Sequence, residues 1–182
     1  MLRVNLLERV SLIEYADDAA LTITGRDRQV TQEKLNLVMR RINLWMGEHG
    51  LQLAIPKTEI ILLTRRRVST EIDVIVDDGG NPHAIQAKTA VKYLGVLLDY
   101  KLNFRGHFQK SCEKAASVAS SLSRLMANIG GPKPGTRRLL MSVVNSVLLY
   151  GSEVWADTTK VAKYRQIISS VQRQAALRIA SA

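Results

Sequence analysis

The sequence predicts an α+β fold, in which a strand-rich first part with one helix is followed by an all-helical second part. Before residue 104, several short stretches alternate apolar and polar residues, which is typical of strands. After it, apolar residues recur at intervals of three and four, which is typical of helices. The charge divides in the same way: residues 1–100 hold 13 Lys and Arg against 13 Asp and Glu, and residues 101–182 hold 13 against 3.

The composition narrows the class of protein. The whole net charge of +10 lies in the second part, which suggests a surface for a polyanion, although an ordinary basic helical domain would have the same balance. No apolar run approaches about 18 residues, and Glu8 and Glu14 interrupt the start, so neither a membrane span nor a signal peptide is expected. The single cysteine, Cys112, excludes an internal disulfide and fits a reducing compartment, so we expect an intracellular protein that is not secreted.

In the first part, residues 10–24 are predicted to form two strands that meet at residues 16–18. Residues 29–48 are predicted to form a helix with Asp27 as its N-cap and an end at His49-Gly50. Its apolar face consists of Leu35, Val38, Ile42, Trp45 and Met46.

Three further strand segments follow. Residues 51–64 are predicted to form a strand bent at Pro56, because proline cannot donate to a sheet ladder. Residues 72–76 begin a hairpin whose turn is predicted over residues 77–82. Residues 90–104 are predicted to form one more strand, with Gly95 at a bulge or a close approach.

Beyond residue 104, three helices are predicted, and the loop GGPKPG separates the first two. No internal repeat is visible. The apolar faces of the helices are Phe104, Phe108, Cys112, Ala115, Ala119, Leu122 and Met126 in the first, Leu139, Leu140, Val143, Val144, Val147 and Leu148 in the second, and Tyr164, Ile168, Val171, Ala175 and Ile179 in the third.

Two adjacent carboxylates, Asp17 and Asp18, stand at the predicted turn between the first two strands. Like charges repel, so a purely structural turn would more naturally carry Asn-Gly or Asp-Gly. Either the pair is solvated at a loop tip or a cation neutralises it. A second pair, Asp77-Asp78, is followed by Gly-Gly, and a simple solvated turn explains it better.

Four sequence blocks occur in a fixed order: YADDAALTI, GLQLAIPKTEIILLT, VKYLGVLLD and LLYGSEVW. In this order and at these intervals they resemble the reverse transcriptase of non-LTR (LINE-type) retrotransposons, and the nearest likeness is to the arthropod R-one and jockey kind. The resemblance covers nearly the whole chain, from about Ser11 to Ala182. It implies that residues 1–104 form part of a polymerase palm and that residues 105–182 form a helical, truncated thumb.

The resemblance implies that the Tyr-Ala-Asp-Asp turn lies at the tip of the palm hairpin and that Asp17 holds catalytic magnesium, with Asp18 as a supporting ligand. Two magnesium ions suit nucleotidyl transfer because they clamp the attacking and leaving oxygens and neutralise their developing charge. Magnesium also prefers few carboxylates and keeps room for water and substrate phosphates. Deoxynucleoside triphosphates are the implied substrates of the intact enzyme.

Further site residues follow from the same resemblance. Lys57 matches a lysine that protonates or shields the pyrophosphate leaving group, although a surface ion pair with Glu59 is the alternative. The KYLGV block matches the primer-grip hairpin, where an ordinary buried strand is the alternative for two of the residues. The primer-grip-like residues are Lys92, Tyr93, Leu94 and Gly95.

The helical part would then hold the RNA template and DNA primer duplex. Its +10 balance fits contacts to phosphates, although solvated helix faces would explain it equally well. LLYGSEVW carries no evident chemistry, and Tyr150 and Trp155 are predicted core residues. The proposed nucleic-acid-binding cluster is Arg124, Lys133, Arg137 and Arg138.

The sequence also departs from the resembled family. A working enzyme needs another aspartate upstream of the hairpin and fingers that close over the nucleotide, and only 16 residues precede Asp17. We therefore expect a fragment that is inactive alone. Two classes of function stay open: a segment of an RNA-directed DNA polymerase, found in nucleus and cytoplasm with the element RNA, or a non-catalytic basic nucleic-acid-binding remnant.

Overall fold

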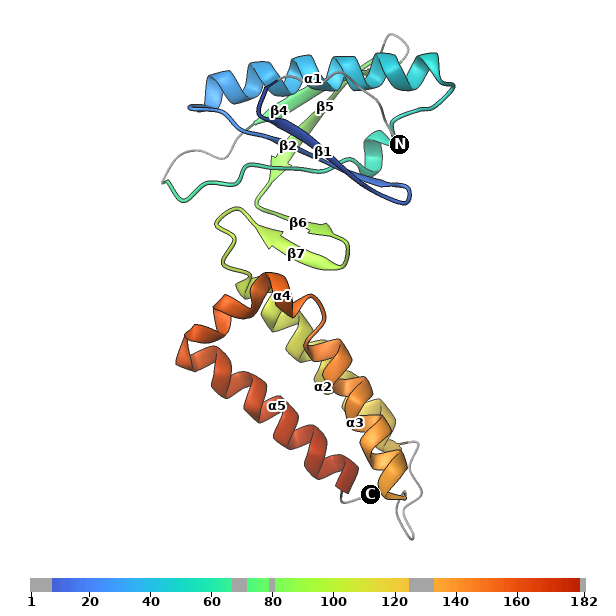
Figure 1. The fold of residues 1–182 in the computed structure, drawn as a ribbon, viewed down its shortest axis with the longest axis vertical. Helices are drawn as coiled ribbons and strands as arrows, with labels where there is room; N and C mark the ends of the chain where they lie inside the picture. Colours follow the sequence, from blue (N-terminus) through green and yellow to red (C-terminus); the bar gives the residue numbers. More distant parts are fainter. Residues whose placement is uncertain (1–7, 67–71, 79–80, 125–132, 181–182) are drawn as a thin grey trace. The chain divides into compact units, whose positions relative to one another are not determined.

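The computed structural model describes residues 8–66, 72–78, 81–124 and 133–180 (Figure 1). The chain divides into two compact units, Met1–Val91 and Lys92–Ala182. The first contains strands and one long helix, and the second is mostly helical, so the α+β class is confirmed. The boundary between the units falls after Val91 and not at the predicted residue 104, because the segment that precedes the helices packs into their core through Val96 and Phe104.

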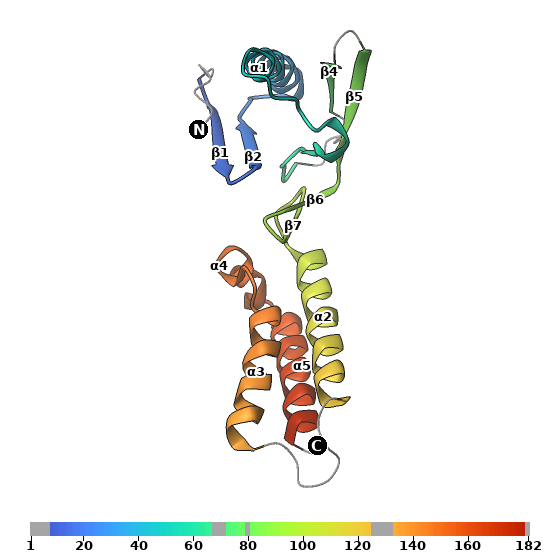
Figure 2. The same ribbon diagram turned by 90° about the vertical axis from the view of Figure 1, so that its right-hand side faces the viewer.

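The first unit combines one hairpin, one helix and one small sheet. β1 pairs antiparallel with β2, and the sheet has the order β3-β5-β4, in which β3 is parallel to β5 and β4 is antiparallel to it. Figure 2 views α1 along its axis, with the hairpin and the β4–β5 strands on either side. The bounds are β1 Val10–Tyr15, β2 Asp18–Ile23, α1 Arg28–Glu48, β3 Ile60–Ile61, β4 Asp73–Asp78 and β5 Asn81–Lys88.

Helix α1 organises the core of this unit. Its N-cap is the predicted one, since Asp27 Oδ1 accepts a hydrogen bond of 2.9 Å from the Val30 amide. The Gln32 side chain then joins α1 to β4, because its amide donates to the Asp73 carbonyl and its oxygen accepts from the Asp73 amide. The buried residues of the cluster that α1 forms with β4 are Val38, Met39 and Ile42 of α1 with Val74 and Val76 of β4.

Two predicted segments of this unit differ from the structure. Residues 51–64 contain only the short β3 and a 3-10 turn, η1 (Ile55–Lys57), because Pro56 starts a tight turn and cannot join a ladder. The second hairpin is confirmed, but its turn is shorter than predicted. Asp78 pairs with Asn81, so Asp77 and Asp78 belong to β4 rather than to the turn.

The second unit starts at Lys92, inside a hairpin, and continues as a helical bundle. β6 (Ala90–Tyr93) pairs with β7 (Val96–Asp99), so residues 90–104 contain the hairpin that the resemblance implied and not the single strand that the residue pattern predicted. Leu94 and Gly95 reverse the chain there, since both have a positive φ. The helices are α2 Arg105–Arg124, α3 Pro134–Leu148, α4 Ser152–Trp155 and α5 Ala162–Ala180, with the 3-10 turn η2 Ala156–Lys160 before α5.

The three long helices lie side by side around one core (Figures 1 and 2). Most of the predicted apolar faces are confirmed. On the predicted face of α3, Val144 and Leu148 are buried, whereas Leu139 and Val143 are exposed. Met126 lies outside the described residues. The fully or nearly buried side chains are Val96, Phe104, Phe108, Cys112, Ala115, Ala119, Val144, Leu148, Trp155, Ala175 and Ile179.

Within the described residues, no single helix has the length and apolar character to cross a membrane. The pair Pro134–Leu148 and Ser152–Lys160 meets both requirements only when taken together, across a bend of 51°.

Candidate functional site

The adjacent carboxylates lie at the tip of the β1–β2 hairpin. β1 ends at Tyr15, which pairs with Asp18, so the turn itself is Ala16-Asp17. Ala16 has φ 54°, a left-handed conformation that an alanine rarely adopts. The predicted hairpin and turn are therefore present, and they place the two aspartates next to each other at its end.

Both carboxylates are exposed. Among the described residues, neither Asp17 nor Asp18 has an ion pair or a side-chain hydrogen bond, and no group of three His, Cys, Asp or Glu could hold a metal ion. The face of the hairpin that bears Asp18 also carries two exposed apolar side chains, Ile13 (54% exposed) and Tyr15 (65% exposed). The turn offers two hard oxygen donors, which suit magnesium.

Lys57 ends the 3-10 turn η1 in the same unit and is exposed. The alternative of an ion pair with Glu59 is wrong, because Glu59 pairs with Lys88 of β5 at 2.6 Å. That pair is itself largely exposed and contributes little to stability. The ammonium of Lys57 is thus not neutralised by its near neighbour.

The β6–β7 turn, which contains two of the predicted primer-grip residues, is braced by Tyr150. The Tyr150 hydroxyl donates a 2.9 Å hydrogen bond to the Leu94 carbonyl. Gly95 has φ 85°, and a Cβ there would lie 2.7 Å from the Tyr150 ring. Glycine is therefore required at 95 by a contact inside the chain, and the predicted approach of nucleic acid to it stays a prediction.

The remaining primer-grip-like residues are differently exposed. Lys92 and Leu94 have exposed side chains, whereas Tyr93 is half-buried. The Tyr93 hydroxyl is buried and has no hydrogen-bond partner in the described part of the chain. A phenol hydroxyl in this position costs free energy, so its neighbourhood is a place where a further partner would stabilise the protein.

The LLYGSEVW block supplies this brace, and the sequence did not reveal it. Trp155 is buried as predicted, at 1% exposed, but Tyr150 is 55% exposed, so its prediction as a core residue is wrong. The Trp155 indole donates to the Tyr150 carbonyl at 2.8 Å. A Cβ on Gly151 (φ 65°) would lie 2.7 Å from the Val96 side chain. The only sequence feature that could have indicated this contact is that a glycine close to a tyrosine occurs in both segments, in YLG (residues 93–95) and in YG (residues 150–151).

A buried histidine joins α2 to the same hairpin. His107 is 5% exposed, and its Nδ1 accepts a 3.2 Å hydrogen bond from the Leu97 amide of β7. Burial lowers the pKa of His107 below its ordinary value, and a hydrogen bond with the Tyr150 backbone opposes this in part. The neutral imidazole is therefore a structural acceptor.

Asp99, at the end of β7, shapes the entry to α2. Its carboxylate accepts hydrogen bonds from the amides of Lys101, Asn103 and Phe104, the last at 2.6 Å. This aspartate has a structural role, because three backbone amides already occupy most of its acceptor sites.

The residues of the predicted basic cluster lie on both sides of residues 125–132, which are outside the described part of the chain. Arg124 is the last residue of α2, and Lys133 caps the start of α3. Arg138 is exposed on the first turns of α3, and Arg137 is half-buried and makes an interaction of its own. These residues therefore lie near one end of the bundle, at the α2–α3 connection (Figure 1).

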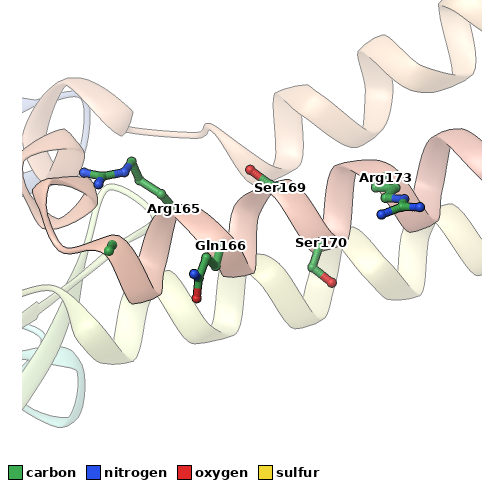
Figure 3. Close-up of a pocket in the computed structure, with 6 residues that line it drawn as sticks. Arg165, Gln166, Ser169, Ser170 and Arg173 are labelled. Carbon is green, nitrogen blue, oxygen red and sulfur yellow. The ribbon is translucent and has the colours of Figure 1, made fainter.

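A second basic surface, which the sequence analysis missed, lies on α5. An open, shallow hollow runs along this helix, and Figure 3 shows its side chains in order from Arg165 to Arg173. The lining residues are Ala162, Arg165, Gln166, Ser169, Ser170 and Arg173.

No protein-family model matches the chain, and no solved structure matches it. A 115 kDa protein in type-1 retrotransposable element R1DM of Drosophila melanogaster is 29% identical over 165 residues, which are 89% of this chain and 16% of that protein.

Two further relatives are retrovirus-related Pol polyproteins from type-1 retrotransposable element R1. The one from Nasonia vitripennis is 27% identical over 92% of this chain and 52% of its own length, and the one from Bradysia coprophila is 23% identical over 89% and 16%. The chain thus spans between about a sixth and about a half of these relatives. Over about 90% of its length, the chain is homologous to proteins of type-1 (R1) non-LTR retrotransposons.

Proposed function

We propose that this chain is the segment of a non-LTR retrotransposon reverse transcriptase that carries its metal-binding hairpin and part of its nucleic-acid-binding surface. The observation that carries the proposal is the Tyr-Ala-Asp-Asp turn, which stands at the tip of an antiparallel hairpin with both carboxylates exposed. Homology to Pol polyproteins supports it.

In this proposal, Asp17 is a magnesium ligand and Asp18 a supporting one. The donor set fits the ion, because magnesium takes one or two protein carboxylates and keeps waters and substrate phosphates for its other positions. When bound, magnesium would neutralise charge on the phosphates of an incoming deoxynucleoside triphosphate. The hairpin's own part is to hold two oxygen donors at a defined point.

Lys57 is proposed to act on the leaving pyrophosphate. Its ammonium is exposed and Glu59 is paired elsewhere, so the charge is available for an anionic group. The β6–β7 hairpin is proposed to steady the primer through Lys92 and Leu94, because these two of its four predicted residues have exposed side chains. The basic helical unit is proposed to hold the template–primer duplex through phosphates.

A specific observation favours a second candidate, a non-catalytic nucleic-acid-binding remnant. The described residues provide two adjacent carboxylates at the tip of the hairpin and no third acidic group close enough to form a metal cluster with them. Losing a metal-holding carboxylate removes much of the charge stabilisation on which phosphoryl transfer depends. We therefore expect the 182-residue chain alone to show no primer extension on RNA with magnesium, and extension that Asp17→Ala abolishes would contradict this.

The proposed function is tested in a longer protein. The chain replaces the matching segment of the Nasonia vitripennis relative, which is 52% of that protein, and extension of a DNA primer on an RNA template is measured with magnesium. We expect extension that falls by at least about a hundredfold in Asp17→Asn, since one carboxylate ligand of the ion is lost. A chimera that is folded and binds the primed template but does not extend it, beside an active parent, would favour the remnant.

A further inference from the structure

We propose that the outer face of α5 is a track for the phosphate backbone of a nucleic-acid duplex, with Arg165, Ser169, Ser170 and Arg173 as its donors. This rests on the proposed nucleic-acid partner, and it assigns that partner to a surface distinct from the cluster at the α2–α3 connection. The face was not singled out by any sequence motif.

All the charged side chains of α5 are positive. The helix carries four cations, Lys163, Arg165, Arg173 and Arg178, and no Asp or Glu. By comparison, α1 and α2 each mix basic with acidic residues, and α3 has only two cations, both near its start. A helix with cations and no acids attracts a polyanion along its whole length, because no carboxylate opposes the approach.

The hollow lies on the face of α5 that is turned away from the core. At 3.6 residues per turn, residues 162, 165, 166, 169, 170 and 173 share one side of the helix. The residues that pack into the bundle, such as Ala175 and Ile179, fall on the other side. The track is therefore a solvent-facing surface and not a gap within the core.

Of the two arginines at the ends of the hollow, Arg165 is held by hydrogen bonds within the chain and Arg173 is not. Nη1 of Arg165 donates to the carbonyls of Thr159 (3.1 Å) and Lys160 (2.9 Å), which holds the guanidinium in place. A guanidinium has five N–H donors, so others remain for an outside acceptor. Arg173 is exposed and has no ion pair or hydrogen bond within the described residues.

The serines between them have uncommitted hydroxyls. In α2 and α3, Ser123, Ser142 and Ser146 donate to the carbonyl three residues back. Ser169 and Ser170 make no such bond in the part of the chain that the structure describes, and both are exposed. Arginine and serine side chains and the Gln166 amide are all groups that contact phosphate oxygens in protein–nucleic acid complexes.

The length of the track suits consecutive phosphates. Eight residues separate Arg165 from Arg173, which is about 12 Å along the helix. One strand of a duplex presents a phosphate about every 3.4 Å along its axis, so the track spans about three to four of them. None of the lining residues is a large apolar side chain. An anionic membrane is therefore the less suitable partner, because helices that lie in its surface bury Trp, Phe or Leu.

The test measures binding of the 182-residue chain to a fluorescent 20-base-pair RNA–DNA hybrid over a range of salt, with two unrelated sequences. The variants are Arg173→Gln and Ser170→Glu. Their matched controls on the exposed face of α2 are Lys110→Gln and Ser117→Glu, which change the charge equally. Circular dichroism confirms that each variant is folded.

We expect Arg173→Gln to weaken binding about five- to tenfold at 0.1 M salt for both sequences and to reduce the slope of log K against log salt by about 1. Ser170→Glu should weaken it at least as much, because it adds a repelling charge. Each control should change the affinity less than about twofold.

Equal effects of the track variants and their controls would overturn the α5 assignment and leave the nucleic-acid partner standing. No binding of the hybrid by the unsubstituted chain at low salt would overturn both. Vesicles with anionic lipid provide the third arm: binding to them that depends on Arg173, without an effect on the hybrid, would also overturn the assignment.

Discussion

Two tight hairpin turns of this chain, Ala16-Asp17 and Leu94-Gly95, are supported in opposite ways. Each reverses the chain over two residues, and each begins with a side-chain-bearing residue at a positive φ, 54° for Ala16 and 44° for Leu94. Tyr150 braces the second turn by a hydrogen bond and by ring contact with Gly95. The first turn has exposed carboxylates that no described side chain neutralises.

The difference shows which of the two turns is held in its conformation by other residues of the chain. A strained turn persists when its surroundings fix it, and the Leu94-Gly95 turn has such surroundings in Tyr150, Gly151 and His107. At the Asp17 turn, two like charges are left to solvent or to a cation. The Leu94-Gly95 turn, here called the braced turn, is thus a structural element of its unit. The Ala16-Asp17 turn, here called the bare turn, is the place where we propose that an ion binds.

The largest expected effect comes from crowding the braced turn. Gly95→Ala puts a Cβ 2.7 Å from the Tyr150 ring at φ 85°, and we expect a loss of about 2–4 kcal/mol in the unfolding free energy of the second unit. The control is Gly50→Ala, which has φ 68° but nothing within 4 Å, and it should cost about 1–2 kcal/mol in the first unit.

Urea unfolding followed by fluorine NMR of 5-fluorotryptophan resolves the two effects, because Trp45 lies in the first unit and Trp155 in the second. Equal losses at Gly95 and Gly50 would mean that backbone conformation alone matters and that Tyr150 does not brace the turn.

A smaller effect is expected from removing one hydroxyl. Tyr150→Phe keeps the ring against Gly95 and deletes the hydrogen bond to the Leu94 carbonyl, which should cost the second unit about 0.5–1.5 kcal/mol. Tyr15→Phe is the matched change at the bare hairpin, where the exposed hydroxyl has no described partner, and it should change stability by less than about 0.5 kcal/mol. The same urea titration measures both, and a Tyr15 loss as large as that at Tyr150 would erase the contrast.

The smallest effect is a pH dependence of the braced region. Because the pKa of His107 is lowered in the folded state, the unfolded chain binds the proton more readily, so stability rises with pH. The contribution is present above the ordinary histidine pKa of about 6.5 and is lost as pH falls from there toward the lower folded pKa. We expect the Trp155 signal to report this loss and His107→Gln to reduce it. An unchanged slope in His107→Gln would assign the dependence to other groups.

Periodicity predicted the helices well. Asp27 as N-cap, the end of α1 at His49-Gly50 and the buried stripe of α2 all agree with the structure, since capping and amphipathic faces are local properties. The β1–β2 hairpin was predicted for the same reason. Leu139 and Val143 were assigned to the core of α3 and are exposed, because the sequence shows an apolar face without showing which part of it meets a neighbour.

What the sequence did not predict depends on contacts between distant residues. The pairing of Glu59 with Lys88, the contact of Tyr150 with Leu94 and Gly95, and the hydrogen bond from Leu97 to His107 each join separate segments. The residue pattern of 90–104 predicted one strand because Leu94-Gly95 is not a common turn sequence, and only the resemblance of KYLGV implied the hairpin. The sequence did not predict the proposed α5 track, because arginine and serine on an exposed helix face form no recognisable motif.

The most direct test of the contrast between the turns is paramagnetic broadening of backbone NMR signals on titrating manganese into the isolated chain. Manganese substitutes for magnesium and should bind the two carboxylates weakly, because hard ions with few protein ligands keep most of their water. The predicted result is broadening centred on residues 15–20 that disappears in Asp17→Asn. Broadening centred on Asp77-Asp78, or none at all, would show that the Asp17-Asp18 turn is a solvated turn and would contradict its assignment as an ion site.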